Sequence, residues 1–139
     1  MKASVTLQEG MHFVATADTG FTVDLDASPA VGGADGGFRP LELLAMSLVG
    51  CTGMDVISIL RKMRQDIIGF KVNFDADHAD THPKVFTEIR VEYEIKGKNI
   101  DQKMVERAVE LSAERYCPVQ AMLEQAVPIK HTYKIVESE

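Results

Sequence analysis

The stretch from Phe38 to Met63 constrains the fold more than any other part of the chain. Its apolar residues recur at the spacing of one helix face: Leu41, Leu44, Ala45, Leu48, Val49, Val56, Ile59, Leu60 and Met63. Thr52 fills the gap in this apolar stripe. Leu43, Met46 and Ile57 add apolar character on other sides. A helix with this pattern is predicted to be central and buried, with the rest of the chain packed around it.

The ends of this helix carry their own signals. Pro40 suits the first helical position, where no backbone N–H is needed, and Glu42 can face the positive end of the helix dipole. Arg61 and Lys62 lie in the last turns, where cations are favourable, and Gly69 is expected to close the helix.

The first third of the chain alternates between apolar and polar residues, which predicts an antiparallel meander of strands with one solvated face. Glu9-Gly10 and Thr19-Gly20 punctuate it as turns. The segment Ser28 to Gly37 contains four glycines and is predicted to be a flexible loop before the helix.

The second half continues with further strands and helices. Alternation predicts strands at 70–77, 85–96 and 129–136, with the outer face of 85–96 solvated. Asp101 is expected to cap a helix that reaches Ser112, and Pro118 to begin another one. The length of the chain predicts a single domain over residues 1–139.

Composition excludes several classes of partner. The chain has 21 acidic and 15 basic residues and a net charge of -6, which disfavours nucleic acid and anionic membrane surfaces. The longest uncharged run in the predicted helix, between Glu42 and Asp55, is shorter than the roughly 20 residues of a membrane span. The N-terminal MKASVTLQEG lacks the apolar core of a signal peptide, so we expect a cytoplasmic protein with reduced thiols.

The two cysteines are the candidate reactive groups. Cys117 precedes Pro118, so its sulfur is expected at a helix N-terminus, where backbone N–H groups and the nearby Arg115 favour the thiolate. Cys51 lies inside the apolar helix, where desolvation alone would raise its pKa. From the residues alone, Cys117 is therefore predicted to be the more acidic thiol.

Three interpretations of these cysteines stay open at this point. Both can be small buried hydrophobic residues, as free cysteines commonly are. Alternatively, they form a peroxide-reducing pair, in which one thiolate is oxidised to a sulfenic acid and the second thiol condenses with it to a disulfide. A metal site is the weakest interpretation, because the four histidines are scattered along the sequence. No metal-binding residue is therefore predicted.

Two segments together resemble the OsmC/Ohr family of thiol-dependent hydroperoxide reductases: RPLELLAMSLVGCTGMDV at 39–56 and VERAVELSAERYCPVQAML at 105–123. The resemblance implies an OsmC-like α+β fold, an antiparallel sheet wrapped around long central helices, in an intertwined homodimer. Its active sites would lie at the subunit interface, with no cofactor. It also implies that Cys51 attacks the peroxide and Cys117 resolves the sulfenic acid. Organic hydroperoxides would be the substrates and a dithiol the reductant.

The resemblance also assigns roles to Arg39 and Glu42. Family peroxidases carry an arginine in the N-terminal strands, whereas this chain has no arginine before Arg39, so Arg39 is expected to replace it. Glu42 matches the family glutamate, but it lies nine residues from Cys51, about 13.5 Å along a straight helix and on its opposite side. Glu42 can therefore either orient an arginine or stabilise the helix start. A non-catalytic dimer that binds small molecules or lipids is the alternative function.

Overall fold

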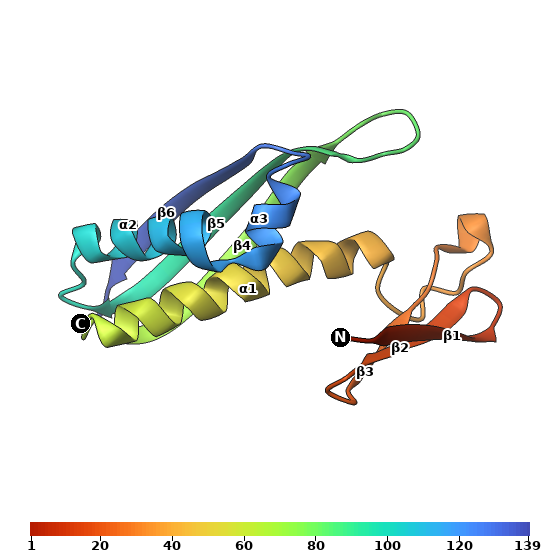
Figure 1. Ribbon diagram of the computed structural model, residues 1–139, viewed down its shortest axis with the longest axis horizontal. Coiled ribbons are helices and arrows are strands. Elements are labelled where there is room, and N and C mark those ends of the chain that lie inside the picture. The colour runs from red at the N-terminus through yellow and green to blue at the C-terminus, as the bar shows by residue number, and fades with distance from the viewer. The chain divides into compact units, whose positions relative to one another are not determined.

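The computed structural model describes residues 1–139, which form two compact units, Met1–Ala45 and Met46–Glu139. We call them the N-terminal and C-terminal units. The N-terminal unit contains three strands, β1 (Ala3–Glu9), β2 (His12–Ala17) and β3 (Thr22–Leu25), in an antiparallel sheet of that order (Figure 1). The predicted meander is therefore confirmed.

The segment predicted to be a flexible glycine-rich loop is instead organised around the carboxylate of Asp26. This carboxylate is 5% exposed and accepts backbone N–H bonds from Ala27, Ala34 and Gly36, at 2.7, 3.2 and 3.0 Å. These bonds, above all that of Gly36, lower the pKa of Asp26. A Cβ at Gly33 would lie 1.9 Å from the Ala27 carbonyl oxygen, so the close backbone approach there requires glycine.

Helix α1 (Pro40–Lys62) begins where the sequence predicts. The expected end near Gly69 is wrong, because the backbone of Arg64 takes a left-handed conformation with φ of 58° and turns the chain out of the helix. Strand β4 (Asp66–His78) follows at once, and Gly69 lies inside it at a register shift.

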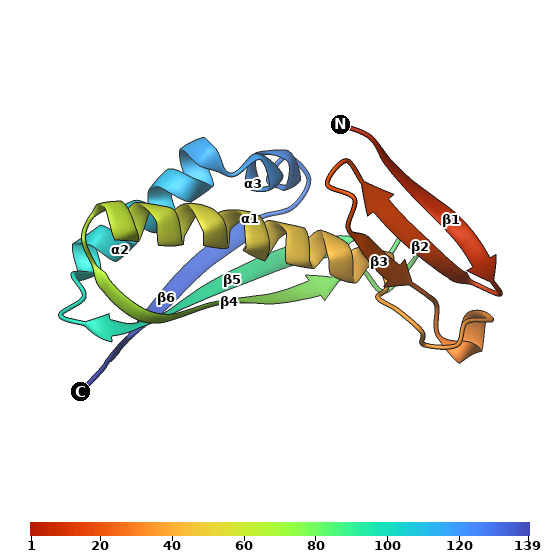
Figure 2. The same ribbon diagram turned by 90° about the horizontal axis from the view of Figure 1, so that it is seen from below.

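The C-terminal unit consists of a sheet with helices on one face. The sheet has the order β4-β5-β6, with β5 at Phe86–Lys98 and β6 at Ile129–Glu137. Three helical segments connect β5 to β6, namely α2 (Gln102–Leu111), the π-helical turn η2 (Ser112–Tyr116) and α3 (Pro118–Leu123). Figures 1 and 2 show them and α1 on the same face of the sheet.

One pairing in this sheet differs from the prediction. Strands β4 and β5 are antiparallel as expected, but β6 pairs with β5 in parallel. The reason is the helical connection, which carries the chain back along the sheet before β6 begins. The α+β class is confirmed, and the sheet of this unit is mixed rather than wholly antiparallel.

Strand β5 is the centre of the core. The inward residues of β5 are completely buried, namely Ile89, Val91, Tyr93 and Ile95. They pack with apolar residues of α1 and α2, namely Leu48, Val56, Leu60, Val105 and Ala108. On the outer face Arg90 pairs with Asp75, Asp77 and Glu88. The predicted division of this strand into an apolar and a polar face is confirmed.

Helix α1 is less buried than predicted. One side lies in the core, but Met46 and Met54 on the other side are 40% and 74% exposed, so no element of the C-terminal unit covers that side. By length and composition α1 could also cross a membrane, contrary to the expectation from its uncharged run. Core helices of soluble proteins pass the same test, and α1 places Leu48, Val56 and Leu60 in the core.

Candidate thiol site

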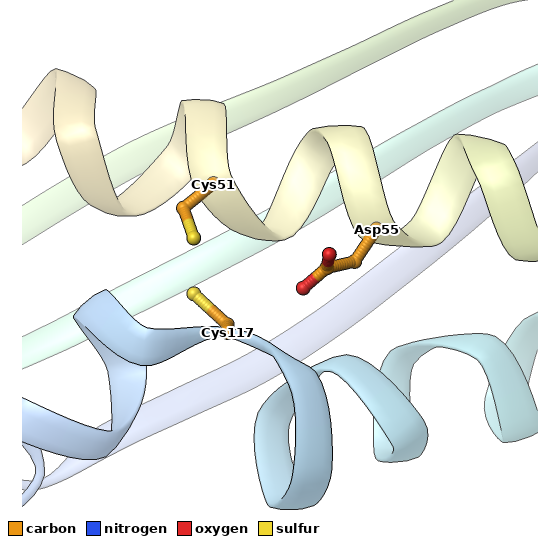
Figure 3. Close-up of side chains that lie close together, drawn as sticks. All are labelled: Cys51, Asp55 and Cys117. Atoms are coloured by element: carbon orange, nitrogen blue, oxygen red, sulfur yellow. The ribbon is translucent and has the colours of Figure 1, made fainter.

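The structure brings Cys51 and Cys117 together from distant parts of the chain. Their sulfur atoms and a carboxylate oxygen of Asp55 all lie within 4.8 Å of one another. Asp55 follows Cys51 by one helical turn, so both side chains project from the same side of α1. Figure 3 shows the two sulfurs pointing toward each other and the carboxylate pointing toward the gap between them. Both cysteines are free thiols.

Cys117 is the N-cap residue of α3, as the sequence predicts. Its sulfur accepts a hydrogen bond from the backbone N–H of Gln120 at 3.3 Å. The predicted stabilisation of the Cys117 thiolate is nevertheless contradicted, because burial, followed by the neighbouring Cys51, raises the pKa of Cys117 to about 11. Desolvation of a sulfur that is only 2% exposed outweighs its bonds to backbone N–H groups. Cys117 is therefore a neutral thiol near pH 7.

A buried set of hydroxyl groups holds Asp55 in place. The Ser112 hydroxyl donates to Asp55 Oδ2 at 3.0 Å. The Thr52 hydroxyl lies 2.8 Å from that of Ser112 and 2.6 Å from that of Tyr93. Asp55 and these hydroxyl groups are not among the site residues predicted from the sequence, in which Thr52 only fills a gap in an apolar stripe. A usable signal was present, since Thr52 and Asp55 are polar residues in the otherwise apolar middle of the helix, 48–57.

The same chain of hydrogen bonds continues on the far side of Tyr93. Its hydroxyl lies 3.0 Å from Nδ1 of His131, whose Nε2 lies 3.1 Å from Oε1 of Gln120. Burial lowers the pKa of His131 and raises that of Tyr93 to about 12. Both groups are therefore neutral near pH 7. The network ends at two carboxyl groups, Asp55, which accepts from Ser112, and Glu124, which accepts from Gln120.

Arg39 and Glu42 belong to the N-terminal unit, where they contact each other. Glu42 Oε1 accepts the backbone N–H of Arg39 at 2.8 Å, as in a capping box at the start of a helix. The Arg39 guanidinium forms an ion pair with Asp35 and donates to the Asp26 carbonyl at 3.3 Å. The bond from the Arg39 backbone N–H supports one of the two roles for Glu42, the stabilisation of the helix start. The catalytic roles of Arg39 and Glu42 stay predictions.

The cluster fits thiol chemistry better than metal binding. The Asp55 carboxylate already accepts a bond from Ser112, and the Cys117 sulfur accepts one from the backbone N–H of Gln120. None of the four histidines joins the three groups, and His131 is engaged by Tyr93 and Gln120. We therefore interpret Cys51, Asp55 and Cys117 as a candidate thiol site.

A surface pocket of about 300 Å³ reaches this site from outside. Its lining comprises Asp55, Ser58, Ile59, Lys62, Leu111 and Tyr116. Solvent can therefore exchange protons with Asp55 while Cys117 stays buried.

Comparison with known proteins places the chain among relatives of one family. The family model described as OsmC-like protein matches residues 32–132. Protein YhfA of Escherichia coli K12 is 36% identical over 136 residues, which cover 98% of each chain. The crystal structure of a hypothetical protein from Aquifex aeolicus VF5 superposes with a TM-score of 0.86 at 29% identity, over 99% of this chain and 97% of the other.

A more distant relative has the same fold. The organic hydroperoxide resistance protein OhrB of Bacillus subtilis gives a TM-score of 0.62 at 22% identity, over 96% of this chain and 98% of that one.

Proposed function

Because the chain belongs to the OsmC-like protein family, we propose that it reduces organic hydroperoxides with the thiols of Cys51 and Cys117. The observation that carries this proposal is the approach of the two sulfur atoms to within 4.8 Å across 66 residues of sequence. Modest local movement is sufficient to close a disulfide bond of about 2.05 Å between them.

The cycle has two chemical steps. The Cys51 thiolate attacks an oxygen of the hydroperoxide and breaks the O–O bond, so that sulfur is oxidised to a sulfenic acid and the organic product leaves as an alcohol. The Cys117 sulfur then attacks the Cys51 sulfur, forms the S–S bond and displaces hydroxide, which leaves as water. A dithiol reductant returns the disulfide to two thiols.

Exposure supports this assignment of roles. Cys51 is half-buried and can meet a small substrate, whereas Cys117 is 2% exposed and is reached only from within the site. A resolving thiol needs only to meet the sulfenic acid next to it, so burial of Cys117 is compatible with the second step and disfavours it as the first nucleophile.

We propose in addition that the active form is a cytoplasmic homodimer. Each unit leaves large apolar side chains uncovered: Val5, Leu7 and Phe21 in the N-terminal unit, and Met46 and Met54 in the C-terminal unit. Uncovered apolar surface of this kind marks a protein interface, and a second copy of the chain is the partner that the family resemblance implies.

Binding without catalysis is the alternative function. An apolar hollow of about 460 Å³ in the N-terminal unit supports it, lined by Val5, Met11, Phe13, Leu25, Asp26, Ala27 and Pro40. This volume and lining suit a small apolar ligand. A protein of this type would bind the ligand and leave both thiols reduced.

One experiment separates the two functions. The reduced protein is mixed with one equivalent of cumene hydroperoxide in buffer containing EDTA, and intact mass and cumyl alcohol are measured. The enzyme predicts loss of two hydrogen atoms per chain together with one equivalent of alcohol. Cys51→Ser should abolish both, whereas unchanged mass in the unsubstituted protein would favour the binding function.

A further inference from the structure

We propose that the Asp55 carboxylate is the base that takes the proton from the Cys117 thiol as it attacks Cys51, and that Ser112 positions this carboxylate. The proposal rests on the function proposed above for the two cysteines. It adds a catalytic residue, Asp55, and a positioning residue, Ser112, neither of which is a cysteine or an arginine.

The geometry places the carboxylate at the reacting atoms. One of its oxygens lies within 4.8 Å of both sulfurs, and it projects from the same helix face as Cys51 (Figure 3). Oδ2 is occupied by the bond from Ser112, at 3.0 Å, which leaves lone pairs of the carboxylate for a thiol proton. Ser112 is itself completely buried and is held by Thr52, so the carboxylate has a fixed support.

The chemistry of Cys117 creates the need for a base. Burial raises the pKa of Cys117 to about 11, so only a very small fraction is thiolate near pH 7. The thiol is a poor nucleophile, and attack on a neighbouring sulfur requires that its proton be removed. Asp55 is the carboxylate in the cluster of three, and the neutral His131 is turned toward Tyr93 and Gln120 instead.

Polar groups from several elements lie near Asp55, and Tyr93 of β5 interacts with it electrostatically. Cys51 and Lys62 lie on α1 with it, Ser112 and Tyr116 come from η2, and Cys117 comes from the start of α3. Lys62 lines the same pocket as Asp55, and this pocket gives the proton a path to solvent.

The step balances as follows. The Cys117 S–H bond breaks and its proton moves to Asp55, while the S–S bond forms and the S–O bond of the Cys51 sulfenic acid breaks. The displaced hydroxide receives that proton from Asp55 and leaves as water. Asp55 ends ionised, and the two electrons lost by the thiols are those that reduced the hydroperoxide.

The test isolates attack by Cys117 from peroxide chemistry. Reduced protein is reacted with Ellman's reagent, which places thionitrobenzoate on the more exposed Cys51, and Cys117 then displaces it. The rate of this second release is measured for wild type, Asp55→Asn and Glu110→Gln, a control at an exposed carboxylate on α2. Folding of each variant is checked by circular dichroism.

The expected results are specific to a base. Asp55→Asn should slow the second release about 100-fold near pH 7, and Glu110→Gln should leave it unchanged. In Asp55→Asn the rate should rise about tenfold per pH unit between about pH 6 and 8, because only pre-formed thiolate reacts, whereas wild type should be nearly flat. Ser112→Ala should slow release by a smaller factor and keep the flat profile, because the base is still present.

Two outcomes would overturn the inference. One is an Asp55→Asn rate within twofold of wild type. The other is a wild-type rate that itself rises tenfold per pH unit, a readout that needs no variant. Failure of the proposed peroxidase would look different: cumene hydroperoxide would leave the thiols reduced while the thionitrobenzoate assay still responded to Asp55.

Discussion

The hydroxyl of Thr52 on α1 lies 2.6 Å from the hydroxyl of Tyr93 on β5, and both residues are completely buried. Tyr93 is bonded in turn to His131, and Thr52 to Ser112. The pair therefore connects the helix that carries Cys51 to the central strand of the sheet. It links the stability of the fold to the geometry of the thiol site.

Thr52→Val removes this link while preserving the shape of the side chain. Tyr93 and Ser112 each lose a buried partner, so we expect the free energy of unfolding to fall by about 1–3 kcal/mol, measured by urea denaturation. Ser58→Ala, which removes an exposed hydroxyl from the same helix, is the control and should change it by less than about 0.5 kcal/mol. Equal effects of the two substitutions would contradict a structural role for the buried pair.

Cys117→Ser should trap the first intermediate of the proposed cycle. Without the resolving thiol, the Cys51 sulfenic acid persists and should be labelled by dimedone after one equivalent of cumene hydroperoxide. Mass spectrometry should show a single adduct on the peptide containing Cys51. In the unsubstituted protein the adduct should be largely absent, because disulfide formation competes with labelling. Strong labelling of both proteins would show that Cys117 does not resolve the sulfenic acid.

Stability should fall in alkaline solution because of Cys117. Its pKa is about 11 in the folded protein against an ordinary value of 9.0, so the unfolded chain loses this proton first. The protonated Cys117 thiol makes its full contribution to the free energy of unfolding below pH 9. This contribution decreases by about 2–3 kcal/mol as the pH rises toward 11. Urea denaturation with a phosphine reductant measures it. Cys117→Ala should show a shallower decline, and parallel curves for the two proteins would refute the assignment.

Gly97 in β5 is predicted to be intolerant of a side chain. A Cβ there would lie 2.2 Å from the Asp66 carbonyl oxygen and 2.6 Å from Cδ1 of Ile100. We expect Gly97→Ala to destabilise the protein by about 2 kcal/mol or more. Gly69→Ala, in the adjacent strand, is a matched control, because its nearest contact would be an ordinary 3.5 Å to Cβ of Lys96. Comparable stability of the two variants in urea would contradict the close approach at Gly97.

The proposed homodimer can be tested at the uncovered side of α1. Met54 is 74% exposed in the single chain, so Met54→Glu should leave its fold intact and weaken self-association. Sedimentation equilibrium should show a dimer for wild type and a shift toward monomer for the variant. Met122→Glu, at a methionine of α3 that is 67% exposed, serves as the control for added charge. A monomeric wild-type protein would refute the homodimer outright.

Local features of the fold were predictable from the sequence. Pro40 at the start of α1, Asp101 as the cap of α2 and Cys117 as the cap of α3 were all placed correctly. The alternation in β5 also gave its buried face. Each of these depends on residues within a few positions along the chain. The end of α1 was missed, because Arg64 rather than a glycine takes the left-handed conformation there.

The candidate site shows the same difference between local features, which were predictable, and long-range contacts, which were not. The two cysteines could be named from the sequence, since an isolated thiol on an apolar helix and a second thiol before a proline are local patterns. Asp55 and Ser112 could not be paired, because they lie 57 residues apart and only the packing of η2 on α1 joins them. The acidity of Cys117 was also predicted in the wrong direction, because its helix position is local while its burial is not.

The sequence by itself determined the presence of the main helices and strands, the caps of α2 and α3, and the two sulfur atoms available for chemistry. The tertiary structure alone decided that β6 runs parallel to β5, that Cys117 lies against Cys51, and that a carboxylate and buried hydroxyl groups surround them. The physical reason is that periodicity and capping act over one or two turns of chain. Desolvation and hydrogen bonding in the core depend on which distant segments are packed together.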